Sequence, residues 1–302
     1  MGKIAYVFSG QGDQYPGMGK PLFEEYTAAR KIFEVCDQLR PGTSKQCFEG
    51  TEEELKETKN TQPCLLAMEL AAAAVLNENG IKPDAVAGFS LGEVAASVAA
   101  GVFDIETGFQ LVCKRGELMQ QAAEKQDARM AAVVRLSAEK VEELCQHYSN
   151  IYPVNFNCPG QITVAGLAEE MPAFSAEVKN AGGRALPLKV KGGFHSPFMK
   201  KAAELFAQEL EKVEAKIPEV ELYSNKTANP YTEDIKGLLA QQICNPVKWE
   251  DTIRNMIDSG IDTFIEIGPG KTLINMIKKI DTEVRTYSIS ELSEMLQDIK
   301  GL

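Results

Sequence analysis

The chain has 302 residues, of which 44% are hydrophobic and 25% charged, and it contains only two histidines, His147 and His195. This composition indicates a globular protein of one large or two smaller domains and excludes disordered, collagen-like and fibrous classes. Forty-three acidic residues against 32 basic ones give a net charge of −11, which repels a phosphate backbone, so we expect no nucleic acid partner.

Membrane and secretory classes are also disfavoured. No apolar run reaches the roughly 18 to 20 residues of a membrane helix, because Glu69 interrupts the richest stretch, residues 64–76. The N-terminus carries neither a signal peptide nor a myristoylation pattern, so we expect a cytoplasmic protein. The seven cysteines are odd in number and widely spaced, without a CxxC, which predicts reduced and mostly buried thiols rather than disulfides or a zinc site.

The N-terminal part alternates short buried strands with helices, the order that an α/β fold requires. Residues 3–8 form the first predicted strand, and the glycine-rich turn at residues 9–13 follows it. A second strand, residues 84–88, runs into a turn at residues 89–92. Helical periodicity covers residues 24–39, 61–79, the stretch after the second turn to about 100, and 106–124.

A smaller unit is predicted to interrupt this fold near Asp127. Its expected order of strand, helix, strand, strand, helix, strand is that of a ferredoxin-like unit. The elements cover residues 129–136, 137–148 with Ser137 as N-cap, 151–157, 161–166, 171–182 and 184–190. We therefore predict a main α/β domain of residues 1–126 and 192–302, with a ferredoxin-like insert at 127–191.

The clearest chemical motif is Gly88-Phe-Ser90-Leu-Gly92, which matches GxSxG. A serine on a strained strand-to-helix turn needs neighbours without Cβ atoms, and the predicted strand and helix on either side supply that context. Ser90 is therefore the candidate nucleophile. The backbone N–H of Leu91, at the start of the following helix, is placed to bind an oxyanion.

A serine needs a base, and only two histidines are present. His147 lies near the end of an amphipathic helix of the insert, where a solvated histidine is the simpler interpretation. His195 lies in a loop with glycines before it and a proline after it, and loops are where catalytic groups concentrate. We therefore assign the base to His195. No acidic third member is identifiable, which leaves a dyad oriented by a main-chain carbonyl as one alternative.

Arg115 follows Ser90 by one predicted helix. Its planar, permanently charged guanidinium suits a substrate carboxylate, although an arginine on a helix is usually solvated. Two phosphate-binding patterns fail: Tyr15 replaces the third glycine of a GxGxxG, and Ile265 replaces the first glycine of a P-loop.

The ordered motifs together resemble the malonyl-CoA:acyl carrier protein transacylase family, including the acyltransferase domains of polyketide synthases. The similarity spans nearly the whole chain. It covers residues 8–14, 88–93, 114–116 with Met119, 157–161 with Gly166, 193–196, 242–247 with Trp249, and 266–270. This resemblance implies an α/β-hydrolase-like core with an inserted ferredoxin-like subdomain, the architecture already predicted from periodicity.

The resemblance also implies roles for individual residues. Ser90 would be the nucleophile and His195 its base, and Arg115 would bind the free carboxylate of a malonyl group. The oxyanion hole would use the backbone N–H groups of Gln11 and Leu91. Three further positions match residues that orient the histidine or support the site, namely Gln242 through its main-chain carbonyl, Asn157 and Gln161.

Two phenylalanines would shape the acyl pocket. The family usually has a histidine before the nucleophile, and this chain has Phe89, which removes a polar neighbour of the acyl group. Phe194 is the bulky residue that the family associates with malonyl over methylmalonyl substrates. One methyl group is worth only about 1 to 3 kcal/mol of such discrimination.

The implied activity transfers malonyl from malonyl-CoA to the phosphopantetheine thiol of an acyl carrier protein, in fatty acid or polyketide synthesis. We expect no bound metal or cofactor and a monomeric enzyme. Carrier proteins of this kind are acidic, so recognition needs a local basic patch, for which the candidates are Arg184, Lys189, Lys191, Lys200 and Lys201.

Two other functions remain open. A serine hydrolase acting on thioesters would share the nucleophile, base and oxyanion hole, but it would have little use for Arg115. A catalytically silent subunit that only docks carrier proteins would not need Ser90, His195 and Arg115 together.

Overall fold

The computed structural model describes residues 2–300, and its larger sheet is wholly parallel. The strand order is β7-β2-β1-β8-β9, with β1 in the middle. In the register, Ala5 of β1 lies opposite Ala85 of β2 and Phe264 of β8. The strands are β1 (Lys3–Phe8), β2 (Ala85–Gly88), β7 (Glu221–Tyr223), β8 (Ile261–Ile267) and β9 (Arg285–Ser288).

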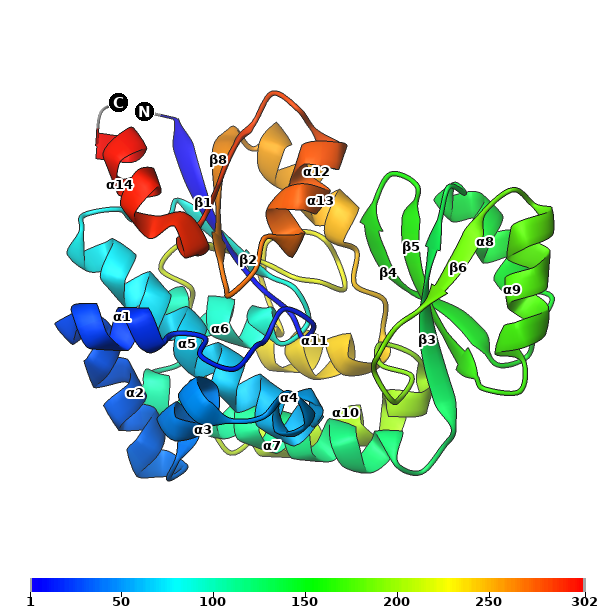
Figure 1. Cartoon of the computed structure of the whole chain (residues 1–302), viewed down its shortest axis with the longest axis horizontal. Coiled ribbons are helices and arrows are strands. Elements are labelled where there is room, and N and C mark those ends of the chain that lie inside the picture. The colour runs from blue at the N-terminus through cyan, green and yellow to red at the C-terminus, as the bar shows by residue number, and fades with distance from the viewer. Residues whose placement is uncertain (1, 301–302) are drawn as a thin grey trace.

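Helices cover both faces of this sheet, because successive residues of its strands alternate between two apolar clusters. Ile4, Tyr6 and Phe8 of β1 pack into the larger cluster, with helices from the first half of the chain and α10. Ala5 and Val7 pack into the other, under α12 and α13. Figure 1 shows the helices around the sheet. Those before the insert are α1 (Lys20–Glu25), α2 (Thr27–Leu39), α3 (Thr43–Glu49), α4 (Glu52–Lys56), α5 (Thr58–Glu78), α6 (Gly92–Ala99) and α7 (Ile105–Ala123).

The helices after the insert complete this domain. They are η1 (Pro197–Met199), α10 (Lys200–Leu210), α11 (Ile235–Gln241), η2 (Gln242–Cys244), α12 (Trp249–Asp258), α13 (Thr272–Ile280), η3 (Ile289–Glu291) and α14 (Leu292–Lys300).

The insert has its own four-stranded antiparallel sheet, in the order β4-β5-β3-β6, and its own apolar core. This order and the alternation of strands with two helices confirm the predicted ferredoxin-like topology. The elements are β3 (Ala128–Val134), α8 (Ala138–Cys145), β4 (Ile151–Cys158), β5 (Gln161–Leu167), α9 (Met171–Asn180) and β6 (Arg184–Pro187). The exact domain boundaries remain a prediction.

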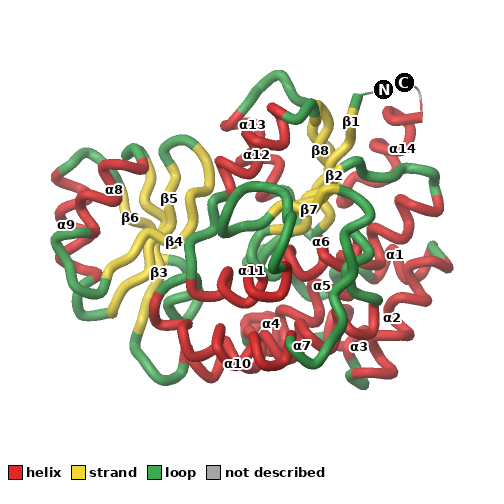
Figure 2. Tube along the Cα trace, turned by 180° about the vertical axis from the view of Figure 1, so that it is seen from behind, coloured by secondary structure: helices red, strands yellow, loops and turns green. Residues whose placement is uncertain are grey.

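Strand β4 of the insert forms backbone hydrogen bonds with the segment that precedes α12 of the main domain. Val247, just before α12, donates its N–H to Val154 O at 2.9 Å and accepts from Phe156 N at 2.9 Å. Figure 2 shows β4 on the side of the insert that faces the rest of the chain. Asn155, which lies between Val154 and Phe156 in β4, bridges to Val247 and is thereby placed close to Ser90, which follows the carboxyl end of β2.

Several predicted boundaries were wrong for local reasons. The single helix expected over residues 24–39 is divided into α1 and α2, because Tyr26 adopts an extended conformation with φ −119° and ψ 123°. Strand β3 ends at Val134 because Arg135 has a left-handed φ of 69°. Strand β6 stops at Pro187 instead of continuing to 190. The helices after residue 192 were not predicted individually.

The side-chain and membrane expectations can be compared with the described residues. All seven cysteines are free thiols, and five of them are buried while Cys113 and Cys244 are partly exposed, as the cysteine pattern predicted. Within residues 2–300, no helix combines the length and hydrophobicity needed to cross a bilayer.

Candidate active site

Ser90 occupies a sharp turn between β2 and α6, at the carboxyl end of the parallel sheet. Its φ of 58° is left-handed, which is rare for a residue with a side chain. A Cβ on Gly88 would lie 1.9 Å from the backbone of Gly92, and one on Gly92 would lie 2.3 Å from Phe8 O. The two glycines of the motif are therefore required by packing, as the sequence predicted, and the turn presents the serine hydroxyl at the sheet edge.

His195 contacts Ser90 directly. Its Nε2 lies 2.7 Å from Ser90 Oγ, and its Nδ1 lies 2.7 Å from the main-chain carbonyl oxygen of Gln242. Since that carbonyl can only accept, Nδ1 carries the proton and Nε2 is free to accept one from the serine. Burial, together with the nearby Arg115 charge, lowers the pKa of His195 to about 4. The imidazole is therefore neutral, and able to act as a base, at physiological pH.

Arg115 of α7 lies beside the same hydroxyl and is fully buried. Its Nη2 donates to Ser90 Oγ at 3.2 Å and to Gln242 Oε1 at 2.7 Å, and its Nη1 donates to Gln62 Oε1 at 2.8 Å. Burial lowers the pKa of Arg115 to about 10, so the group stays charged at neutral pH. A buried cation held by neutral amides is suited to bind a carboxylate that a substrate supplies.

Three polar residues that the sequence analysis assigned no role complete this arrangement. Asn225 accepts from Ser90 N at 2.7 Å and donates to Gly88 O, which fixes both sides of the turn. Glu93 accepts from Gln242 Nε2 at 2.8 Å, and Gln62 holds Arg115. Glu93 and Gln62 are polar residues inside apolar helical stretches, and a buried polar side chain of this kind could have indicated a functional role from the sequence. Asn225 lies in a loop with no local pattern to indicate it.

The predicted oxyanion and pocket residues line one small cavity with the dyad. It has a volume of about 90 Å³ and is bounded by Ser90 and His195, with the predicted residues Gln11, Phe89, Leu91 and Phe194. Phe89 packs edge-to-face on Trp249 with ring centroids 5.5 Å apart, so its ring belongs to the apolar cluster under α12 as well as to the cavity. The backbone N–H groups of Gln11 and Leu91 remain predicted oxyanion donors.

Asn157 and Gln161 lie in a second cavity of about 220 Å³ that shares Gln11 and Phe89 with the first. Asn157 Nδ2 donates to Thr163 Oγ1 at 3.2 Å, and Gln161 Oε1 accepts from Lys279 Nζ at 3.3 Å. Neither contacts Ser90 or His195 directly, so their predicted role is at most to support the site. Asn155, which the sequence analysis did not select, lines both cavities.

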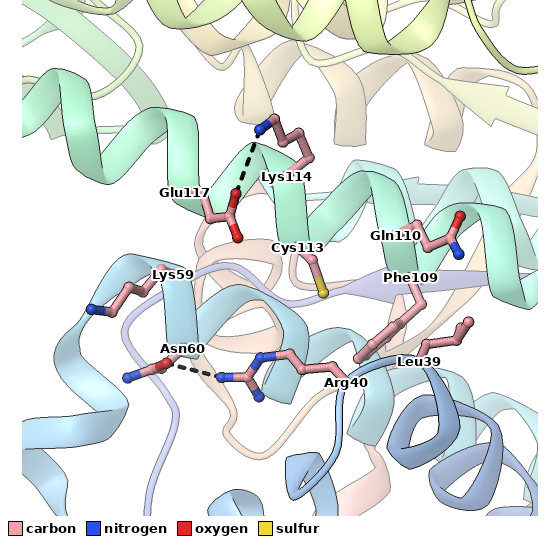
Figure 3. A pocket seen from close by; sticks show the side chains of 9 residues that line it. All are labelled: Leu39, Arg40, Lys59, Asn60, Phe109, Gln110, Cys113, Lys114 and Glu117. Carbon is pink, nitrogen blue, oxygen red and sulfur yellow. Dashed lines mark hydrogen bonds and ion pairs between the residues drawn. The ribbon is translucent and has the colours of Figure 1, made fainter.

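A larger cavity of about 440 Å³ lies against another face of α7 (Figure 3). There the Cys113 thiol points toward Arg40, whose Nη2 donates to Asn60 Oδ1 at 2.9 Å. None of the candidate catalytic or substrate-binding residues lines it. Burial raises the pKa of Cys113 to about 12, which keeps this thiol protonated and weakly nucleophilic. Size therefore does not identify the active site in this molecule.

His147 lies away from the site, on the surface of the insert, as predicted. Its side chain is 52% exposed, and Nδ1 lies 2.8 Å from Glu177 Oε2. Among the described residues, no cluster of histidine, cysteine and acidic side chains could hold a metal ion. The site thus combines a partly exposed serine with a buried histidine that contacts it and a buried cation beside the nucleophile.

Comparisons with known proteins agree with this chemistry. The sequence model of the acyl transferase domain matches residues 5–296. The chain is 40% identical over 299 residues to the malonyl CoA-acyl carrier protein transacylase of Bacillus subtilis (strain 168), covering 96% of this chain and 94% of that relative.

Solved structures with the same fold are also similar to this chain. The malonyl CoA-acyl carrier protein transacylase of Clostridium perfringens superposes with a TM-score of 0.96 at 33% identity, covering 99% of this chain and 98% of that one. A malonyl-transacylase in complex with a type II PKS acyl-carrier protein gives 0.95 at 32% identity, covering 99% and 100%. The chain belongs to the malonyl-CoA:acyl carrier protein transacylase family.

Proposed function

We propose that this protein transfers a malonyl group from malonyl-CoA to the phosphopantetheine thiol of an acyl carrier protein. The observation that carries the proposal is the meeting of three groups at one atom: Ser90 Oγ lies 2.7 Å from His195 Nε2 and 3.2 Å from Arg115 Nη2. A nucleophile with its base explains acyl transfer, and the adjacent buried cation explains an acyl group that carries a second carboxylate. The names of its relatives support the same activity.

The first half-reaction forms an acyl-enzyme. Ser90 Oγ attacks the thioester carbonyl carbon while its proton passes to His195 Nε2, and the backbone N–H groups of Gln11 and Leu91 stabilise the tetrahedral oxyanion. The C–S bond then breaks, the coenzyme A sulfur takes the proton from His195, and malonyl remains as an ester on Ser90. Gln242 O holds Nδ1 throughout, so the imidazole keeps the orientation that both proton transfers need.

The second half-reaction reverses these steps with another thiol. The phosphopantetheine thiol of the carrier gives its proton to His195 and attacks the ester carbonyl. Collapse of the tetrahedral intermediate breaks the bond to Ser90 Oγ, which recovers the proton from His195. Malonyl leaves as the carrier thioester, and the enzyme returns to its starting state in a ping-pong sequence.

Intact-mass analysis after mixing with malonyl-CoA tests this function. We expect a malonyl adduct that is absent from Ser90→Ala and that disappears when a holo acyl carrier protein is added, with malonyl appearing on the carrier. Coenzyme A release without a lasting adduct would instead indicate a thioester hydrolase. No reaction would indicate a docking subunit without catalysis.

The carrier protein is proposed to bind near the basic residues Arg184, Lys189, Lys191, Lys200 and Lys201, all of which are exposed. Lys189 and Lys191 lie after β6 and line a cavity of about 420 Å³ with Glu53, Glu57 and Glu124, so the surface there is of mixed charge. Lys201 pairs with Glu204 at 3.3 Å. Lys189 and Lys191, which follow β6 and precede His195, are therefore the candidates that we test.

Charge reversal tests the docking proposal. Lys189→Glu with Lys191→Glu should raise KM for the carrier by about tenfold and leave KM for malonyl-CoA within about twofold. Lys31→Glu with Lys45→Glu, on α2 and α3, changes the net charge equally and serves as the control. An equal rise in both KM values, or the same rise in the control, would rule out the patch.

A further inference from the structure

Glu93 is a fully buried carboxylate three residues after the candidate nucleophile. It accepts from the Tyr231 hydroxyl and from Asn225 N, at 3.0 Å, through Oε1, and from Gln242 Nε2 at 2.8 Å through Oε2. Within the described residues, no lysine or arginine lies within ion-pair distance of Glu93. All of its direct partners are therefore neutral donors, the Arg115 charge acts on it only from beyond them, and one of those donors contacts the active site.

The contact with Gln242 fixes the orientation of its side-chain amide. Nε2 donates to Glu93 Oε2 and, at 2.7 Å, to Ser90 O, whereas Oε1 accepts from Arg115 Nη2 at 2.7 Å. A carboxylate and a carbonyl only accept, and a guanidinium only donates, so these partners determine which way the amide points. A reversed amide would set its NH₂ group against the guanidinium.

We propose that Glu93 is a positioning residue that aligns Arg115 for the substrate carboxylate through the Gln242 amide, an inference that rests on the malonyltransferase function proposed above. Arg115 Nη2 is shared between Gln242 and Ser90 Oγ, so a rotation of that amide redirects the N–H that faces the reacting centre. A substrate with a second carboxylate depends on that direction. An acetyl group, which has no such carboxylate, does not.

The base is held independently of this side chain. His195 Nδ1 bonds the main-chain carbonyl of Gln242, and His195 N donates to Ile243 O at 3.1 Å. These main-chain contacts remain if the Gln242 amide rotates. Loss of Glu93 should therefore weaken malonyl selection much more than it weakens the serine–histidine reaction itself.

The test compares first-turnover acylation of the full-length enzyme by malonyl-CoA and by acetyl-CoA, followed by intact mass. In Glu93→Gln the new amide cannot satisfy Gln242 Nε2 and Asn225 N together, because one of its two ends must donate. We expect the malonyl-to-acetyl rate ratio to fall by about tenfold or more. Glu69→Gln is the matched control, because Glu69 is also a buried carboxylate but accepts from Ser9 Oγ and contacts neither Gln242 nor Arg115. Its ratio should stay within about twofold.

A double-mutant cycle separates a relay from a general structural effect. If Glu93 acts through Arg115, Glu93→Gln should slow malonyl acylation strongly in the native background and by less than about twofold in Arg115→Ala. Equal losses in both backgrounds, or equal losses for malonyl and acetyl, would overturn the proposal.

Gln242→Met keeps the inference testable if Glu93→Gln does not fold. This variant keeps the main-chain carbonyl under His195 but removes the amide, so the same fall in the malonyl-to-acetyl ratio is expected. An unchanged ratio would overturn the relay. The proposed function is tested separately, by the malonyl adduct of the native enzyme and its transfer to the carrier, so its failure can be told apart from a failure of the Glu93 or Gln242 variants.

Discussion

The regions around the two histidines differ in almost every physical respect. His195 is 3% exposed, has a left-handed φ of 59°, and has both ring nitrogens bonded, one to the Ser90 hydroxyl and one to a main-chain carbonyl. His147 is half-exposed near the end of α8, where one nitrogen pairs with a surface glutamate. The difference shows that burial and two directed hydrogen bonds, rather than the imidazole itself, make a histidine a base.

The charged groups of the two regions differ in the same way. Beside His195, the Arg115 guanidinium is buried among neutral amides, so its charge is available to a substrate carboxylate. Beside His147, Glu177 already supplies the opposite charge. Exposed pairs of this kind are worth little, with a typical contribution of about 0 to 1 kcal/mol. Of these charged groups, only Arg115, whose direct hydrogen-bond partners among the described residues are neutral, is thus expected to bind a substrate carboxylate.

Replacement of the buried histidine should have the largest effect. Glutamine in place of His195 retains hydrogen-bonding capacity but cannot take the serine proton, so we expect first-turnover acylation to fall by about 10³- to 10⁴-fold. The measurement is the burst of coenzyme A released from malonyl-CoA. Circular dichroism should show native secondary structure, and a burst of normal size and rate would remove His195 from the mechanism.

Removal of the cation should be the next largest effect, and it should be selective. Arg115→Ala leaves the dyad intact but removes the only buried cation that contacts Ser90 among the described residues. We expect malonyl acylation to fall by roughly 10²- to 10³-fold, the effect of losing a buried charge pair, with acetyl acylation little changed. If both substrates reacted as fast as with the native enzyme, Arg115 would have no role in selection.

The size of the acyl pocket gives a smaller, testable effect. Phe194 is 8% exposed and bounds the 90 Å³ cavity, so Phe194→Ala should relieve the exclusion of a branched α-carbon. We expect the methylmalonyl-to-malonyl ratio of kcat/KM to rise by about tenfold, the value of one methyl group in such a pocket. Phe194→Leu should give an intermediate ratio, and an unchanged ratio in both variants would place the selectivity elsewhere.

The pH dependence of acylation should report the environment of His195. His195 must be neutral to act as a base, and burial with the Arg115 charge lowers its pKa to about 4. Acylation by acetyl-CoA, which does not need the Glu93 carboxylate, should therefore persist to well below the ordinary histidine range and be lost only as pH falls through about 4. In Arg115→Ala the pKa of His195 rises, so the acidic limb measured with acetyl-CoA should move to higher pH. A limb that stayed in place would mean that Arg115 does not act on the imidazole.

Much of the fold and site could be predicted because the relevant signals are local. The short buried strand β1, the strand–turn–helix around Ser90 and the six-element order of the insert are all short-range patterns, and the structure has each of them. Ser90 and His195 could be selected because a GxSxG turn needs a base and the chain offers only two. Arg115 depended on the resemblance, since nothing local distinguishes it from a solvated arginine.

The residues that could not be predicted act at long range. Asn225 reaches the Ser90 turn from 135 residues away, and Tyr231 reaches Glu93 from 138 residues away. No periodicity or motif encodes a contact of that kind. Boundaries failed where the backbone of a single residue overrides a pattern: Tyr26 is extended between α1 and α2, and Arg135 is left-handed with its N–H bonded to Gly160 O at 3.0 Å.

Replacement of the exposed histidine, His147, should have the smallest effect of these changes. His147→Gln removes the contact with Glu177 Oε2, but Glu177 Oε1 still accepts from the Tyr148 hydroxyl at 2.9 Å. Neither residue lines the cavities beside Ser90. We expect acylation and carrier transfer within about twofold of native and a change in unfolding free energy below about 1 kcal/mol, measured by urea denaturation. A large loss of activity would show that the insert contributes to catalysis through its outer surface. It would also contradict the conclusion that only His195 of the two histidines takes part in the reaction.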